Sequence, residues 1–130
     1  MKHHFELSDY WSAIFAKDGR AIRSFFLPEA LIYWHNTNEC MTAREFARVS
    51  ANYPGSWNGE IQYELHVGEW NDDLVVCALH VFSTDSRASM HVCSAIQLHE
   101  GKIACINEYW GEDGMPPAWR KAMGVGRPIK

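Results

Sequence analysis

The sequence lacks the features that mark several large classes of protein. Its longest unbroken apolar stretch, Leu74 to Leu79, is far too short to span a bilayer, and residues 1–11 contain no apolar run typical of a secretory signal. Positive charge is not in excess, because 12 lysine and arginine residues stand against 16 aspartate and glutamate residues. A net charge of −4 gives no electrostatic reason to bind nucleic acid or anionic lipid. We therefore expect a cytoplasmic protein that binds neither nucleic acid nor membranes.

The usual metal, disulfide and nucleotide motifs are also missing. The four cysteines, Cys40, Cys77, Cys93 and Cys105, include no C-x-x-C pair, and three of them lie in apolar segments where a reduced cysteine acts as a small hydrophobe. The glycines form no phosphate-binding arrangement, and no serine-hydrolase, zinc-protease or calcium-loop motif occurs. The sequence predicts no metal site and no cofactor.

What the sequence does contain is enough apolar material for one core. Its 130 residues are 47% hydrophobic, which suits a single domain, and no internal repeat or Gly/Ser linker divides them. We expect one domain over residues 1–130, with its core at about 5–120 and a tail at 115–130.

The chain changes from helical to strand periodicity near residue 57. Apolar spacing predicts helices at about 7–18, at 22–27 and at 42–53, the second ending before Pro28 and the third opening with the capping box Thr42-Ala43-Arg44-Glu45. Residues 30–35 predict an isolated strand. Alternation then predicts strands at 57–67, 74–83, 88–98 and 102–110. The pattern indicates an α+β domain in which three N-terminal helices pack on a mainly antiparallel sheet.

Turn positions give the expected pairing of these strands. A three-residue loop at His99-Glu100-Gly101 would place Val92 opposite Glu108, and a turn at Asp85-Ser86 would place Leu79 opposite Val92. The same arithmetic puts Tyr63, Leu65 and Val67 on that apolar inner face. Glu108 is then expected to point inward between Ile106 and Trp110.

The order of these elements resembles the nuclear transport factor 2-like (NTF2-like) superfamily, and within it the SnoaL-like branch. The resemblance spans about residues 5–120 and is sharpest at Gly101-Lys102-Ile103 and at Asn107-Glu108-Tyr109-Trp110-Gly111, which precedes a proline-rich tail. It implies a cone in which helices and a strongly curved sheet enclose an apolar pocket. It also implies a homodimer formed through the outer sheet face.

Ketosteroid isomerases are related to this branch, but their chemistry does not carry over. Their chemistry uses a catalytic base, a tyrosine of the first helix and a protonated aspartic acid. By this resemblance, the corresponding positions in this chain are Trp34, Trp11 and Ser94, in that order. Neither indole offers a basic lone pair, and serine needs a partner base, so these groups cannot abstract a carbon-bound proton.

Glu108 is the candidate catalytic residue. A carboxylate walled by apolar groups has a raised pKa, and several SnoaL-like and epoxide-hydrolase relatives resemble this chain in carrying an acid there. The alternatives are a polar ligand contact, or a solvated ion pair with Lys102 or Arg120. The expected ligand-binding residues, which could equally be plain core, are Trp11, Phe15, Trp34, Phe46, Tyr53, Tyr63, Val92, Ser94, Ile106 and Trp110.

Histidines form a second candidate set. The expected pairing aligns Glu64, His80, His91 and Tyr109 in one row on the outer face, beside Cys93, where they would belong to a dimer interface. If the faces were exchanged, His80 and His91 would be the acid–base pair instead. Trp119 is expected to be covered, either by the rim of the cone or by a partner subunit.

Three functions remain open at this point. The first is a small-molecule-binding SnoaL-like protein, and if it is an enzyme, a cofactor-free isomerase, cyclase, dehydratase or hydrolase that uses Glu108 as acid or base. The second is a non-catalytic carrier or sensor of a small apolar ligand. The third is a dimeric interaction module whose cone is filled by its own side chains.

Overall fold

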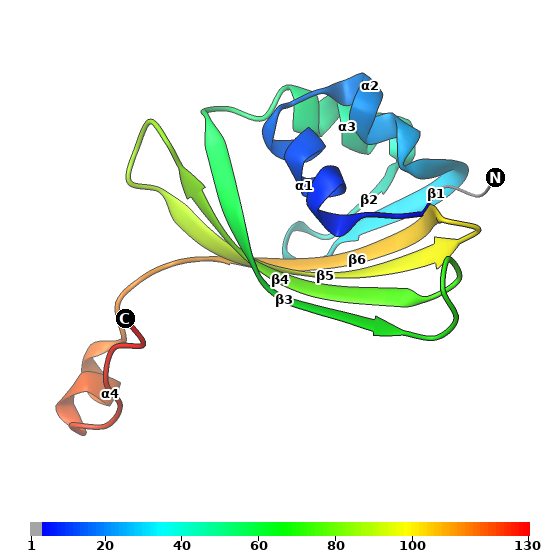
Figure 1. Ribbon diagram of the computed structural model, residues 1–130. Helices are drawn as coiled ribbons and strands as arrows, with labels where there is room; N and C mark the ends of the chain where they lie inside the picture. The colour runs from blue at the N-terminus through cyan, green and yellow to red at the C-terminus, as the bar shows by residue number, and fades with distance from the viewer. Residues whose placement is uncertain (1–3) are drawn as a thin grey trace.

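A curved six-stranded sheet with helices on its concave side forms the body of the protein in the computed structural model, which describes residues 4–130 (Figure 1). In chain order the elements are α1 (Leu7–Phe15), α2 (Gly19–Ser24), β1 (Phe26–Trp34), the 3-10 helix η1 (His35–Thr37), β2 (Glu39–Thr42), α3 (Ala43–Ala51), β3 (Trp57–Val67), β4 (Leu74–Ser83), β5 (Ser89–His99), β6 (Lys102–Glu112) and α4 (Ala118–Ala122). The fold is α+β, as the sequence predicts.

The strands follow the order β2-β1-β6-β5-β4-β3, and only the β1–β6 pair is parallel. Figure 1 shows α1, α2 and α3 together on one side of this sheet. The core lies between the two layers, where Ile32, Leu79, Ile96 and Ile106 are fully buried. One face of the sheet is thus covered and the other is left open.

The second helix is shorter than the sequence pattern suggests. α2 ends at Ser24, and Phe26, expected on that helix, instead opens β1 four residues before the predicted strand. Pro28 explains the change, since proline disfavours helix before it and cannot donate a ladder hydrogen bond. The pairing of β1 with β6 is accordingly irregular between Phe26 and Leu31. The short strand β2 and the helix η1 were not predicted.

The third helix begins where the sequence predicts. The Thr42 hydroxyl accepts a hydrogen bond from the Glu45 N–H at 3.1 Å, and the Glu45 carboxylate accepts one from the Thr42 N–H at 3.0 Å. The capping box is confirmed, and it fixes the helix that carries Phe46 against the sheet.

Strand pairing beside Glu108 keeps the predicted face but not the predicted partner. The β5–β6 turn has two central residues, Glu100 and Gly101, both with positive φ, and a bulge follows at residue 104. Each feature shifts the register by one residue, so Glu108 lies opposite Ser94 and not Val92. Two such shifts together leave the side chain on the inner face. The predicted β4–β5 register is confirmed, with Leu79 opposite Val92.

The predicted register of β3 is wrong. A bulge between Ile61 and Tyr63 inserts one extra residue and turns the later part of the strand over. Tyr63, Leu65 and Val67 therefore lie on the outer face, where the Tyr63 side chain is 55% exposed. Tyr63 is not a ligand-binding residue of the inner face.

The C-terminal segment leaves the body of the protein. Every residue from Gly111 onward is exposed, and Figure 1 shows α4 standing apart from the sheet. Trp119 is 66% exposed, so the expectation that it covers the rim of its own cone is wrong. Within residues 4–130, no helix is long and apolar enough to cross a membrane.

Candidate functional site

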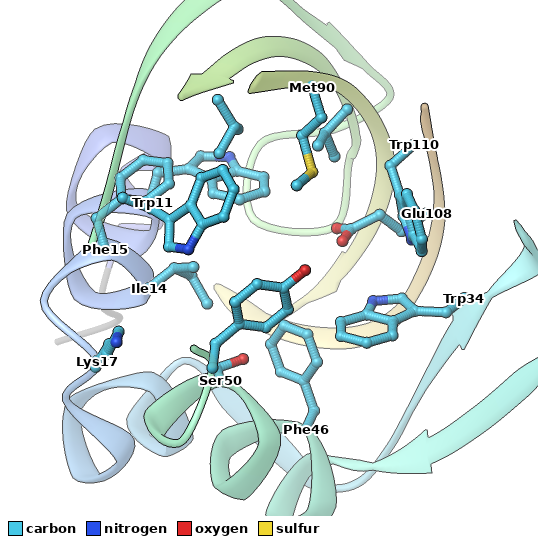
Figure 2. A pocket seen from close by; sticks show the side chains of 14 residues that line it. Trp11, Ile14, Phe15, Lys17, Trp34, Phe46, Ser50, Met90, Glu108 and Trp110 are labelled. Atoms are coloured by element: carbon cyan, nitrogen blue, oxygen red, sulfur yellow. The ribbon is translucent and has the colours of Figure 1, made fainter. Parts of the chain in front are cut away.

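A cavity of about 110 Å³ lies between the helices and the concave face of the sheet. Aromatic side chains from five separate helices and strands, together with Tyr53 from the loop after α3, form much of its wall (Figure 2). Of the residues predicted to bind a ligand, those that line it are Trp11, Phe15, Trp34, Phe46, Tyr53, Val92 and Trp110. Ser94 and Ile106 are fully buried beside it, and Tyr63 lies on the opposite face of the sheet.

The spacing of the helices explains how distant aromatics meet. Trp11 and Phe15 are four residues apart on α1, so they lie on one face, with ring centroids 5.8 Å apart. Phe46 on α3 meets the edge of Trp34 from β1 at 6.0 Å. Trp110 comes from the end of β6 and lies on the same wall of the cavity as Trp34, with Glu108 between the two indoles in the view (Figure 2). The wall is therefore held by helices and strands and not by loops alone.

Glu108 is the acidic group of this cavity. It lies on β6, is only 7% exposed, and points its carboxylate toward the space between Trp34, Met90 and Trp110 (Figure 2). Burial raises its pKa from the ordinary 4.5 to about 7, because the charged form loses its hydration. Such a group exists in both protonation states near neutral pH.

Two donors oppose that rise in the pKa. The Ser94 hydroxyl donates a hydrogen bond of 2.6 Å to Oε2 of Glu108, from the residue directly opposite on β5. The indole N–H of Trp34, opposite Glu108 on β1, also favours the charged carboxylate. Trp34 Nε1 has no hydrogen-bond partner at normal geometry among residues 4–130, so it keeps donor capacity for another acceptor.

The ion-pair interpretation of Glu108 is wrong. The Lys102 ammonium donates to the Ser24 carbonyl at 2.6 Å, on the far end of the same strand. Arg120 lies on the exposed α4 over the ring of Trp119, 5.6 Å from its centroid. Neither cation reaches the carboxylate, and no cation within residues 4–130 is among the groups that shift its pKa.

Several lining residues were missed by the sequence analysis. They are Ile14, Lys17, Ser50, Trp57, Val81 and Met90. Lys17 follows α1 with a φ of 55°, and its ammonium binds the Gly55 carbonyl at the rim. A single left-handed lysine in a loop carries no periodic signal, whereas Val81 and Met90 could have been found from the β4–β5 register.

Asn36 also has a role that no pattern indicated. Its side-chain amide brackets the backbone of Trp110: Nδ2 donates to the carbonyl, and Oδ1 accepts from the N–H at 2.9 Å. Next to it, the His35 ring stacks on Tyr109 with centroids 4.5 Å apart. η1 thereby fixes the end of the strand that carries both Glu108 and Trp110.

Two further buried groups lie behind the cavity. The Tyr10 hydroxyl on α1 is fully buried without a hydrogen-bond partner among the described residues, and burial together with Glu108 raises its pKa well above the usual value. Burial also raises the pKa of the Cys77 thiol to about 11, which makes it inert as a nucleophile at neutral pH.

The histidine pair lies on the outer face, as predicted, but with different neighbours. His80 and His91 are opposite each other and stack at 4.9 Å. Glu60 is opposite His80, and Gly111 is opposite His91, so Glu64 and Tyr109 do not belong to this row. Over residues 4–130 no group of histidine, cysteine and acidic side chains is arranged to hold a metal ion.

Comparison with known proteins turns on structure, since no family model and no curated protein sequence matches the chain. A protein from Kribbella flavida proposed to be a ketosteroid isomerase superposes with a TM-score of 0.74, 15% identity and coverage of 95% of this chain and 87% of that one. An NTF2-like protein of unknown function from Burkholderia xenovorans superposes with a TM-score of 0.71 and 18% identity, and the match covers 94% of this chain and 91% of that one.

The chain has the NTF2-like fold. A Shewanella putrefaciens protein proposed to be a SnoaL-like polyketide cyclase supports this with a TM-score of 0.63, 12% identity and coverage of 76% of this chain and 73% of that one. In this NTF2-like cone the cavity occupies the space between the helices and the concave sheet, and Glu108 is its buried acid.

Proposed function

We propose that this protein binds a small, largely apolar molecule in the aromatic cavity and that Glu108 transfers a proton to or from it. The observation that carries the proposal is the position of Glu108, a buried carboxyl at the wall of an apolar cavity, where burial raises its pKa to about 7. A general base works best when its pKa lies near the working pH, because proton transfer in both directions is then accessible.

Proton transfer next to a carbonyl is the reaction that fits these groups. In the base form, Glu108 accepts a proton from the carbon beside the carbonyl, and the electron pair of that C–H bond moves to give an enolate. The donor to the enolate oxygen in this proposal is the N–H of Trp34, which has no hydrogen-bond partner at normal geometry among residues 4–130. Where a carbon–carbon double bond is conjugated with the enolate, return of the proton from Glu108 to the far carbon of that double bond completes an isomerisation. Attack of the enolate carbon on a second carbonyl instead forms an alkoxide, which takes up the proton from Glu108 and completes a cyclisation.

Ser94, Tyr63 and Tyr53 are the expected ligand-binding residues that carry a hydroxyl group, and the first two are not available to that oxygen. Ser94 already donates to Glu108, and Tyr63 is on the outer face. Tyr53 lines the cavity, and it therefore remains a candidate donor together with Trp34.

The cavity also limits the size of the ligand. Its volume of about 110 Å³ is somewhat below the roughly 150 Å³ of an engineered apolar cavity that accepts benzene. The proposal is therefore a molecule that places one small ring or a short chain inside the cone. An open space of this size weighs against a cone filled entirely by its own side chains.

The second candidate is a carrier or sensor that uses the same cavity without chemistry. The mostly apolar lining supports it equally well, since only a few polar groups reach the cavity. Structures of similar fold do not separate the two, because their identity to this chain is below 20% and carries the fold alone.

Exchange of carbon-bound hydrogen separates a catalyst from a carrier without knowledge of the natural substrate. A panel of small cyclic ketones and enones in D2O, followed by proton NMR, should show exchange at the carbon beside the carbonyl with the unmodified protein. Glu108→Gln should slow that exchange at least about 100-fold, the usual contribution of a general base, while ligand dissociation constants change only a few-fold.

The matched control is Glu112→Gln, which removes an exposed carboxylate from the end of the same strand and should leave exchange unchanged. Binding of the same compounds with no exchange above the buffer rate would support the carrier. An equal decrease in the exchange rate in Glu108→Gln and Glu112→Gln would contradict a specific role for Glu108.

A further inference from the structure

The outer face of the sheet is unusually apolar for a surface in water. An antiparallel sheet with one solvated face normally alternates apolar and polar side chains. Here the strands β3 to β6 instead present a continuous group of apolar or weakly polar side chains on that face: Tyr63, Leu65, Val67, Val76, Ala78, Cys93, Ala95 and Tyr109. We call this group the outer apolar face.

The C-terminal arm, residues 114–130, is a second uncovered apolar surface. Its large apolar side chains are all exposed, from 57% at Val125 to 101% at Ile129, and they include Met115, Trp119 and Met123. Figure 1 shows the arm leaving the end of β6 and carrying α4 away from its own sheet. An isolated five-residue helix is not stable in water, so this conformation requires a surface to pack against.

We propose that the C-terminal arm of one copy packs on the outer apolar face of a second copy, in a reciprocal exchange that makes the protein a homodimer. Trp119 is the anchor of the contact. The exchange is closed by a twofold axis, because the same arm and the same face occur on both subunits.

Charge complementarity selects this partner surface. The arm from Gly114 to Lys130 holds four of the twelve basic residues and none of the sixteen acidic ones, so the rest of the chain has eight more acids than bases. The six strands contain one basic residue, Lys102, whose ammonium is bound to the Ser24 carbonyl on the helical side. Glu60 and Asp113 lie on the outer side, around the stacked histidines, and offer carboxylates to the arm.

The exposed area is also large enough. The accessible surface is 8688 Å², whereas a compact monomer of this mass exposes about 7,000 Å². The excess exceeds the roughly 800 Å² that each partner buries in a standard stable interface. Covering the arm and the outer apolar face would bring the molecule back to the surface expected for its mass.

The geometry of the arm points to a second copy. Gly114 has open space around it, and Pro116 and Pro117 extend and stiffen the segment that follows. The five residues 113–117 reach up to about 16 Å, which crosses about three strands. That reach takes Trp119 from the end of one β6 to the middle of a neighbouring sheet, while the stiff segment holds it off its own.

Photo-crosslinking distinguishes an arm that packs on a second copy from an arm that folds back on its own subunit. p-Benzoylphenylalanine in place of Trp119 should, on irradiation, give a covalent dimer whose crosslinked peptides come from β3, β4 or β5. The matched control is the same replacement at Trp70, an exposed tryptophan in the β3–β4 loop that stacks on His4. Only a monomeric product with an internal crosslink at position 119, or equal dimer yield from both positions, would overturn the proposal.

Sedimentation measures the contribution of the arm to assembly. The full chain should be a dimer at micromolar concentration, and Trp119→Ala should raise the dimer dissociation constant at least about 30-fold, as expected for an anchoring tryptophan. Trp70→Ala should leave it unchanged. Removal of residues 114–130 should give a monomer whose far-ultraviolet spectrum loses only the small helical contribution of α4. A monomeric full chain, or a dimer that keeps its dissociation constant without the arm, would contradict the proposal.

Discussion

At Glu108, burial and hydrogen bonding act on one carboxyl in opposite directions. Loss of hydration raises its pKa, and the Ser94 hydroxyl and the Trp34 indole lower it, with burial the larger effect. The outcome, a pKa of about 7, depends on the absence of a nearby cation among residues 4–130. A charge-compensated carboxylate would stay ionised and would be a poor proton donor.

The raised pKa of Glu108 makes a prediction about stability. The group titrates at about 4.5 unfolded and about 7 folded, so the folded state binds more protons between these values and loses stability as the pH rises through them. Glu108→Gln removes this penalty. In urea titrations, the free energy of unfolding of Glu108→Gln minus that of the unmodified protein should therefore increase by on the order of 3 kcal/mol between pH 4.5 and 7.5.

A pH-independent difference between the two proteins would contradict that burial. The control is Glu112→Gln, which removes an exposed carboxylate from the same strand and should not reproduce the gain in stability of Glu108→Gln.

Gly59 is the residue whose small size shapes the cavity wall. A Cβ atom there would lie 2.6 Å from Cζ of Phe15 and 3.1 Å from the His80 carbonyl oxygen. Gly59→Ala should therefore displace Phe15 and destabilise the fold by roughly 1–3 kcal/mol, measured by urea unfolding. Restored stability in the double variant Gly59→Ala, Phe15→Leu would identify Phe15 as the cause. An unchanged free energy of unfolding in Gly59→Ala would show that α1 and β3 approach each other less closely.

At the scale of elements, β-bulges decide which residues face the cavity. Alternation placed β4 correctly, because its period is unbroken from Leu74 to Ser83. In β3 an extra residue between Ile61 and Tyr63 reverses the face, and no residue type at that point signals it. In β6 the shorter turn and the bulge compensate each other, so the predicted face of Glu108 was retained although its partner was not.

The β5–β6 turn offers a test at this scale. Glu100 and Gly101 both have positive φ, at 50° and 78°, as a type I′ turn requires. Asparagine tolerates that conformation better than glutamate, and Asn-Gly is the favoured sequence for this turn. Glu100→Asn should raise the free energy of unfolding by roughly 0.5–1 kcal/mol in thermal or urea unfolding. A loss of stability would mean that the turn has another geometry.

At the scale of the whole molecule, the order of elements could be predicted, whereas the open volume could not. The α+β class and the capping box follow from periodicity and local hydrogen bonding. Aromatics such as Trp11 and Phe46 have the same spacing whether they fill a core or line a cavity. Lys17 lies in the turn after α1, and Asn36, which binds the backbone of Trp110, lies in the short helix η1. Neither position carries a periodic signal in the sequence.

The function rests on the way the complete fold excludes water from one carboxyl. Helices from the N-terminal half cover the concave face of strands from the C-terminal half, and Glu108 lies between them with 7% exposure. Any variant that opens the cone should therefore lower the pKa of Glu108 toward its ordinary value.

The most direct test is a carbon-13 NMR titration of the glutamate side-chain carboxyl signals, with Glu108 assigned by the disappearance of its signal in Glu108→Gln. The account predicts an apparent pKa near 7 for Glu108. An apparent pKa near 4.5 for Glu108 would show a hydrated carboxylate and would contradict the proposed acid–base role.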